Sequence, residues 1–137
     1  AVVYGKAEMI HKGSEIALVA VGSMVETACE VRKILKEKGL DVTVVNERFI
    51  KPIDAGMIHK LSFDHKLIVT MEENVGLGGF GDTVCQYADD SQLDVKVLNI
   101  ALPDDYVEHG NVSILKKEEG IDAAGVADRV LSFYTNI

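Results

Sequence analysis

Short apolar runs alternate along this chain with segments in which the apolar residues recur at helical spacing. The first such run extends from Ser14 to Val21, and helical spacing follows from Met24 to Lys38. An apolar run of this length predicts a buried strand, and apolar residues three and four positions apart predict a helix with one buried side. Gly39 follows directly and marks the expected end of the helix. The first third of the chain is therefore predicted to fold as strand, turn and helix.

The same alternation continues to the end of the sequence. The predicted strands cover residues 41–45, 67–71 and 95–100, and the predicted helices cover 55–61, 80–88, 111–119 and 123–134. Residues 6–11 precede a turn and predict an edge strand or hairpin arm. Strands that alternate with helices are typical of a parallel sheet with helices on both faces. We expect an α/β fold with three layers (α/β/α), in which about five strands form a mostly parallel sheet with one antiparallel edge strand.

Composition narrows the class of protein. The chain has 137 residues, which fit a single domain over 1–137, and it is 47% hydrophobic. It contains no uninterrupted apolar run of about 18 residues, so we expect no membrane span. Its 14 Lys and Arg against 22 Asp and Glu give a net charge of −8, which repels a phosphate backbone. Nucleic acid is therefore not an expected partner.

The two cysteines and the first residues of the chain give a prediction of the cellular compartment of the protein. Cys29 and Cys85 lie in predicted helices with apolar neighbours, so we expect reduced, buried thiols and a cytoplasmic protein. The first residues lack the basic segment followed by a long apolar stretch that a secretion signal requires. The sequence does not begin with Met, which suggests a piece of a longer protein.

A glycine-rich turn follows the predicted strand 67–71. Glu72 and Glu73 leave the end of that strand, and glycines recur over 76–81 ahead of a predicted helix that starts at Phe80. This edge of an α/β sheet is where ligands and partners usually bind. The glycines fit tight packing between strand and helix, or an approach of backbone N–H groups to an anion or partner. Neither a dinucleotide fingerprint nor a Walker loop is present.

A second charged loop follows the strand 41–45. Asp54 is predicted to cap the helix that begins at Ala55, because an Asp at this position accepts hydrogen bonds from the first helical N–H groups. Arg48 has two interpretations. It forms an internal bidentate bridge with Glu72 or Glu73 on an adjacent strand end, or it contacts another chain or domain.

The remaining polar candidates are weak as catalytic groups. His109 stands beside Glu108 in a loop after the last predicted strand, where it can act as an acid or base or as a structural hydrogen-bonding group. The four histidines are not spaced as metal ligands. Ser23 lacks the surrounding glycines of a hydrolase nucleophile and is predicted to cap the helix after it.

Several segments together resemble the C-terminal domain of the transketolase-like thiamine-diphosphate enzymes. The segments are Gly5-Lys6, Gly22-Ser23-Met24, Arg48-Phe49-Ile50-Lys51-Pro52-Ile53-Asp54, Glu72-Glu73-Asn74, Gly78-Gly79-Phe80-Gly81, Leu102-Pro103-Asp104, Glu108-His109-Gly110 and Gly120-Ile121-Asp122-Ala123. Within this group, the segments at 102–110 and 120–123 are most similar to those of the 1-deoxy-D-xylulose-5-phosphate synthase family.

The resemblance implies a longer enzyme that condenses pyruvate with glyceraldehyde 3-phosphate, releases carbon dioxide, and uses thiamine diphosphate and Mg²⁺. In this family other domains hold both cofactors, and the chain has no match to the metal-binding Gly-Asp-Gly region or to the activating glutamate. We expect no cofactor in this chain, no activity of the chain alone, a cytoplasmic homodimer, and packing against upstream domains. Loop placement predicts the residues on or near the surface that faces those domains, which are Arg48, Asp54, Glu72, Glu73, Gly78, Gly79 and His109.

Two alternatives stay open. The chain is a docking domain of a transketolase or 2-oxo acid dehydrogenase β-type subunit, or it is an anion-binding α/β module that works by itself.

Overall fold

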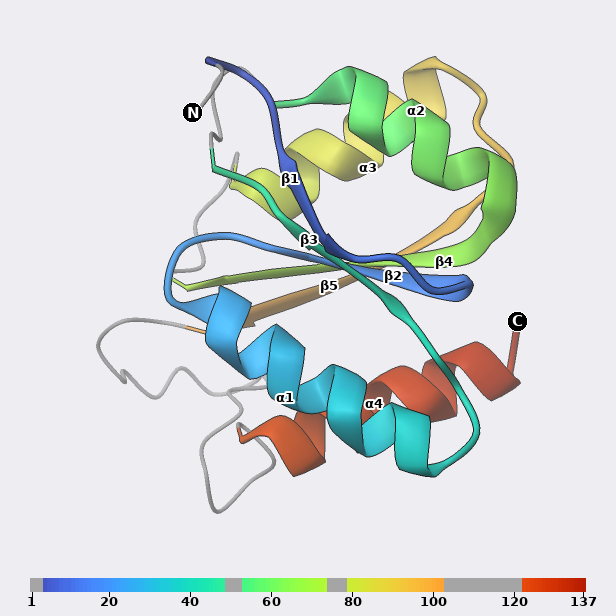
Figure 1. Cartoon of the computed structure of the whole chain (residues 1–137). Helices are drawn as coiled ribbons and strands as arrows, with labels where there is room; N and C mark the ends of the chain where they lie inside the picture. The colour runs from blue at the N-terminus through green and yellow to red at the C-terminus, as the bar shows by residue number, and fades with distance from the viewer. Residues whose placement is uncertain (1–3, 49–52, 74–78, 103–121) are drawn as a thin grey trace, which may run out of the picture.

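The helices and strands alternate along the chain as the sequence predicts (Figure 1). A computed structural model describes residues 4–48, 53–73, 79–102 and 122–137. The elements are β1 (Glu8–His11), β2 (Glu15–Ala20), α1 (Met24–Glu37), β3 (Thr43–Asn46), α2 (Ala55–Asp64), β4 (His65–Glu73), α3 (Phe80–Asp90), β5 (Lys96–Leu102) and α4 (Ala123–Thr135).

The strands form one five-stranded sheet in the order β1-β3-β2-β4-β5. β3, β2, β4 and β5 run parallel, and β1 pairs antiparallel with β3 at one edge. The predicted fold class is confirmed, including the antiparallel edge strand. Because the four parallel strands run in the same direction, their last residues lie at the same side of the sheet. These residues are Ala20, Asn46, Glu73 and Leu102. We call this side the carboxyl edge; it lies on the left in Figure 1.

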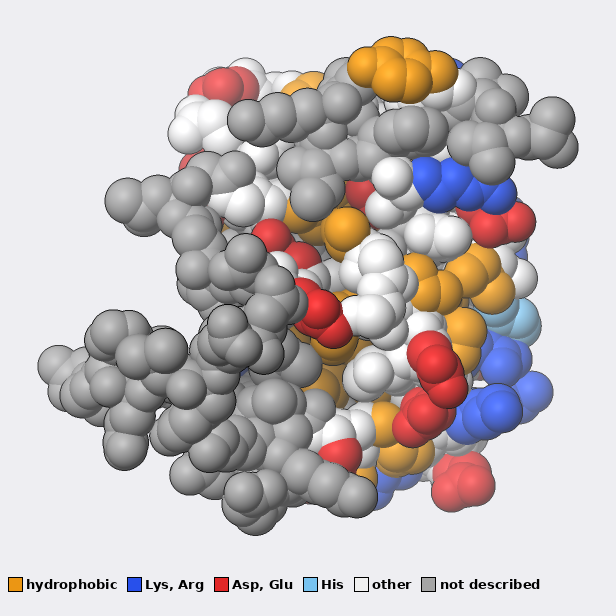
Figure 2. Space-filling view, turned by 90° about the vertical axis from the view of Figure 1, so that its left-hand side faces the viewer, with side chains coloured by type: hydrophobic (Ala, Val, Ile, Leu, Met, Phe, Trp, Pro, Cys, Tyr) orange, Lys and Arg blue, Asp and Glu red, His pale blue; other side chains and the backbone are white. Residues whose placement is uncertain are grey.

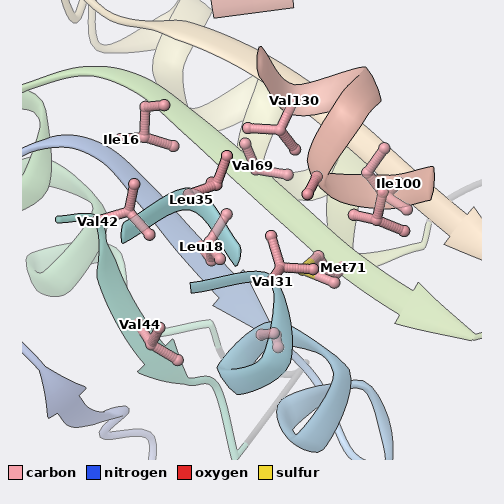
Figure 3. Close-up of a cluster of buried hydrophobic side chains, with 14 of the residues drawn as sticks. Ile16, Leu18, Val31, Leu35, Val42, Val44, Val69, Met71, Ile100 and Val130 are labelled. Carbon is pink, nitrogen blue, oxygen red and sulfur yellow. The ribbon is translucent and has the colours of Figure 1, made fainter. Parts of the chain in front are cut away.

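Helices cover both faces of the sheet, α1 and α4 one face and α2 and α3 the other (Figure 1). Side chains of β2 alternate between the two cores, as they must along a strand. Ile16 and Leu18 join the cluster with α1 and α4, which Figure 3 shows, and Ala17 and Val19 join the cluster with α2 and α3. This burial on both faces explains why the strand is a continuous apolar run.

The structure corrects several details of the prediction. β4 continues past its last apolar residue, because Glu72 and Glu73 still pair with β5. Ser23 stands at the start of α1, but its hydroxyl donates to the carboxylate of Glu73 instead of capping the helix. Cys29 and Cys85 are free thiols that are partly rather than fully buried. The helix predicted at 111–119 lies outside the described residues.

No helix within the described ranges combines the length and apolar character that crossing a membrane requires.

The C-terminal helix is joined to the start of β2 by a polar contact. The Tyr134 hydroxyl donates to Glu15 Oε2 at 2.7 Å, and the Lys66 ammonium lies 3.3 Å from the same oxygen. The hydrogen bond from Tyr134, followed by that from Lys66, lowers the pKa of Glu15 below its ordinary value of 4.5. The same contact raises the pKa of Tyr134 above 10.0.

When the pH is lowered, the Tyr134→Phe variant is expected to lose less unfolding free energy than the unmodified chain. Because the Glu15 pKa is lower in the folded state, its contribution is present above pH 4.5 and is lost as the pH falls through the folded pKa. The variant removes the largest cause of that shift. Urea unfolding at pH 7 and pH 3 should show a smaller difference in unfolding free energy for Tyr134→Phe than for the unmodified chain. An equal difference would show that the contact contributes nothing.

Candidate functional site

The carboxylate of Glu72 caps the helix that follows the glycine-rich turn. Glu72 Oε1 accepts from the Phe80 N–H at 3.0 Å and Oε2 accepts from the Gly81 N–H at 2.6 Å. These are the first two residues of α3, whose N-cap residue, Gly79, has no side chain to offer. Glu72 is buried at the end of β4, with 7% of its surface exposed. The anion that a helix N-terminus attracts is therefore supplied by the strand that precedes the helix.

Gly81 is required by a close approach between α3 and β5. A Cβ at this position would lie 2.7 Å from Asn99 Cγ. The Asn99 side chain is held in turn by the Thr70 hydroxyl, which donates to its Oδ1 at 2.6 Å, and by Cys85 Sγ, which is 3.4 Å from its Nδ2. Of the two interpretations of the glycines, the structure thus supports tight packing at Gly81.

Asp54 is the cap of α2, as its place in the sequence predicts. Its Oδ1 accepts from the Met57 N–H at 3.0 Å. Its Oδ2 accepts from the Ala7 N–H at 2.9 Å, and its own N–H donates to Glu47 Oε2 at 3.2 Å. Asp54 is 7% exposed and Glu47 is fully buried. The carboxylate therefore holds two separate parts of the main chain.

Arg48 forms an internal ion pair, but the predicted partner was wrong. Its Nη2 lies 3.0 Å from Glu8 Oε1 on β1, and the pair with Glu72 or Glu73 is not made. The strand order gives the physical reason, because β2 separates the end of β3 from the end of β4. The neighbour of β3 on its other side is β1, which carries Glu8.

At the carboxyl edge, two buried acidic side chains, Asp54 and Glu72, bind main-chain N–H groups. Figure 2 views this edge, and acidic side chains lie near its middle among hydrophobic ones. Glu72 and Asp54 use both carboxylate oxygens on backbone N–H groups. Within the described ranges, no group of His, Cys, Asp and Glu could hold a metal ion. At the start of α3, the Glu72 carboxylate already accepts from the N–H groups that an anion such as a diphosphate would need.

Two hollows open on the surface formed by the described residues. A groove of about 490 Å³ between α2 and α3 is lined by Ile53, Ala55 and Tyr87, among others. A larger hollow of about 850 Å³ includes Lys66 and Lys96 and lies at the starts of β4 and β5, the opposite side of the sheet from the carboxyl edge.

The predicted site residues are only partly brought together. Asp54 and Glu72 are buried, Glu73 is exposed at the carboxyl edge, and Gly79 is the N-cap residue of α3. Gly78 and His109 lie outside the described residues. Glu47 and Asn99 are not among the residues that the sequence pattern predicts for the site. A polar residue that interrupts or ends an apolar strand is the signal that could have found both.

Comparison with known proteins shows which family this domain resembles. Residues 5–126 match the family described as "Transketolase, C-terminal domain". A 1-deoxy-D-xylulose-5-phosphate synthase of Lachnoclostridium phytofermentans is 48% identical over 130 residues, which are 94% of this chain and 21% of that protein. One of Dehalococcoides mccartyi is 43% identical over 134 residues, which are 96% of this chain and 21% of that protein.

A solved structure agrees with these relatives. It is titled "Split gene transketolase, inactive beta4 tetramer" and superposes with a TM-score of 0.81 at 26% identity, covering 96% of this chain and 42% of its own. The chain spans about a fifth of the length of the two synthases named above. Because the family match extends over most of its 137 residues, the chain belongs to the transketolase C-terminal domain family.

Proposed function

We propose that this chain is the C-terminal domain of a thiamine-diphosphate-dependent 1-deoxy-D-xylulose-5-phosphate synthase. Such an enzyme joins pyruvate to glyceraldehyde 3-phosphate and releases carbon dioxide, in the supply of isoprenoid precursors, thiamine and pyridoxal. The observation that carries the proposal is the 48% identity over 130 residues with a synthase of that name.

The proposal divides the work between this domain and the rest of the enzyme. Thiamine diphosphate, with Mg²⁺, supplies the means to stabilise the carbanion formed from pyruvate. We assign those cofactors to the other domains. The carboxylate oxygens of Glu72 and Asp54 already accept hydrogen bonds from backbone N–H groups. This domain packs against the preceding domains in a cytoplasmic homodimer. The carboxyl edge, with Arg48, Asp54, Glu72, Glu73 and Gly79, is the proposed surface toward them.

The alternatives are less well supported. An independent anion-binding module would need a free helix start in the glycine-rich turn, and the carboxylate of Glu72 occupies the start of α3. The second alternative, a domain of a β-type subunit, shares the fold. This chain covers 42% of the split-gene transketolase chain, which is such a relative by fold.

The test uses the native polypeptide that contains these residues. Tryptic peptides of this chain, identified after denaturing electrophoresis, should come from a polypeptide about five times longer. The purified polypeptide should then form 1-deoxy-D-xylulose 5-phosphate from pyruvate and glyceraldehyde 3-phosphate. A polypeptide two to three times longer that transfers two-carbon units between sugars, without using pyruvate, would instead identify a transketolase subunit.

A further inference from the structure

Two consecutive residues at the start of the sheet are held by the loop that follows β3. The Ala7 N–H donates to Asp54 Oδ2 at 2.9 Å, and Glu8 Oε1 lies 3.0 Å from Arg48 Nη2. In Figure 1 the beginning of β1 lies beside the segment that leads into α2, and the hydrogen bond from Ala7 shows that this closeness is real. The chain thus enters the domain through a contact with two residues of one sequence motif.

Asp54 is itself held in place from two sides. Its N–H donates to Glu47 Oε2 at 3.2 Å, and its Oδ1 caps α2 by accepting from Met57 N–H at 3.0 Å. With only 7% of its surface exposed, the Asp54 carboxylate cannot turn without giving up one of these bonds. It is therefore a rigid acceptor for the Ala7 N–H.

The Arg48 contact is the weaker of the two. The Arg48 side chain is 26% exposed and that of Glu8 is 48% exposed, so solvent screens their attraction. Its position matters more than its strength, because it holds Glu8, the first residue of β1 and the one that follows Ala7. Together the two contacts define both the position and the direction of the entering chain.

We propose that Asp54 and Arg48 are positioning residues that anchor the entry of the chain to the carboxyl edge. The proposal rests on the proposed function in one respect, which is that the preceding domain of a longer enzyme is joined to the chain ahead of Ala7. The anchor then sets how this domain is oriented on the preceding one. Arg48 and Asp54 thereby act on the connection between the domains, in addition to their place at the proposed surface toward the preceding domain.

The variant Asp54→Asn tests the hydrogen bond to Ala7 separately from the cap of α2. Asparagine caps a helix about as well as aspartate, but it has one acceptor oxygen and cannot serve both Met57 and Ala7. Asp122→Asn is the matched control, because Asp122 caps α4 through the Gly125 N–H at 3.0 Å and stands at a helix start in the same way.

The first measurement is hydrogen exchange in the longer enzyme, at the amides of residues 7–11 and, as a reference, of residues 16–19. Asp54→Asn should accelerate exchange at 7–11 about tenfold relative to the reference strand, and Arg48→Met should add to this effect. Asp122→Asn should change neither. Equal exchange in Asp54→Asn and Asp122→Asn would overturn the proposal. This result does not depend on which reaction the enzyme catalyses, so it is separate from the test of the proposed function.

The second measurement concerns domain orientation. A spin label at the exposed position 63 on α2 and another on the preceding domain report the distribution of the distance between them. Asp54→Asn should widen this distribution about twofold and Asp122→Asn should leave it unchanged. Faster exchange at 7–11 with an unchanged distribution would show a local contact only and would also overturn the proposal.

Discussion

Glu72→Gln is expected to lower the free energy of unfolding by about 2–4 kcal/mol, because it removes one of the two hydrogen bonds that the carboxylate accepts at the start of α3 and leaves the other without its charge. Glutamine has a single acceptor oxygen, and its NH₂ group would face a backbone N–H of Phe80 or Gly81. Since the site is 7% exposed, water cannot easily replace the lost acceptor. Urea denaturation at neutral pH gives the free energy directly.

Glu73→Gln is the matched control for this variant. Glu73 is the next residue, carries the same group, and is exposed, with its carboxylate accepting from the Ser23 hydroxyl. Glutamine keeps an oxygen that can accept from Ser23, so the change should be within about 0.5 kcal/mol. Equal losses in the two variants would contradict the assignment of Glu72 as the cap of α3.

Gly13→Ala is expected to cost about 3 kcal/mol or more, because the added methyl group has no room. A Cβ at Gly13 would lie 2.1 Å from the backbone oxygen of Asp41. The chain would have to move where the Gly13 N–H donates to Thr43 Oγ1 at 2.8 Å. That hydroxyl also contacts His65 Nε2 at 2.7 Å inside the protein, so the disturbance reaches a buried polar group. The midpoint of thermal unfolding and urea denaturation both measure the effect.

Gly56→Ala makes the same change where there is space. The nearest atom to its Cβ would be Asp54 Oδ1 at 3.5 Å, an ordinary contact, and the residue lies within α2. Alanine favours the helix over glycine by up to about 1 kcal/mol, so this variant should be as stable as the unmodified chain or more stable. A loss in Gly56→Ala as large as that in Gly13→Ala would refute the steric explanation.

The sequence was sufficient for the order and type of the described elements, because the pattern of burial is local. Ile16 to Ala20 are buried on both faces of the sheet, and α1 buries Ala28, Val31 and Leu35 on one side. Each pattern can be recognised within a few residues. The end of β4 was less predictable, since its last residues are charged and are held there by pairing with β5.

The partners of the site residues could not be predicted in the same way, because they depend on strand order. Arg48 pairs with Glu8 only because β1 adds to β3 at the edge of the sheet, a neighbour relation that no local pattern specifies. The role of Glu72 likewise depends on how α3 returns over β4. The capping role of Asp54 was predictable, since it depends on residues three positions apart.

Glu72 and Asp54 use their carboxylates to hold the main chain, and we propose that other domains bind the cofactor. Isothermal titration of the 137-residue chain with thiamine diphosphate in the presence of Mg²⁺ tests this most directly. We expect no heat of binding at millimolar concentrations of the ligand. Stoichiometric binding that Glu72→Gln abolishes and Glu73→Gln preserves would contradict the account, because it would place a cofactor site in this domain.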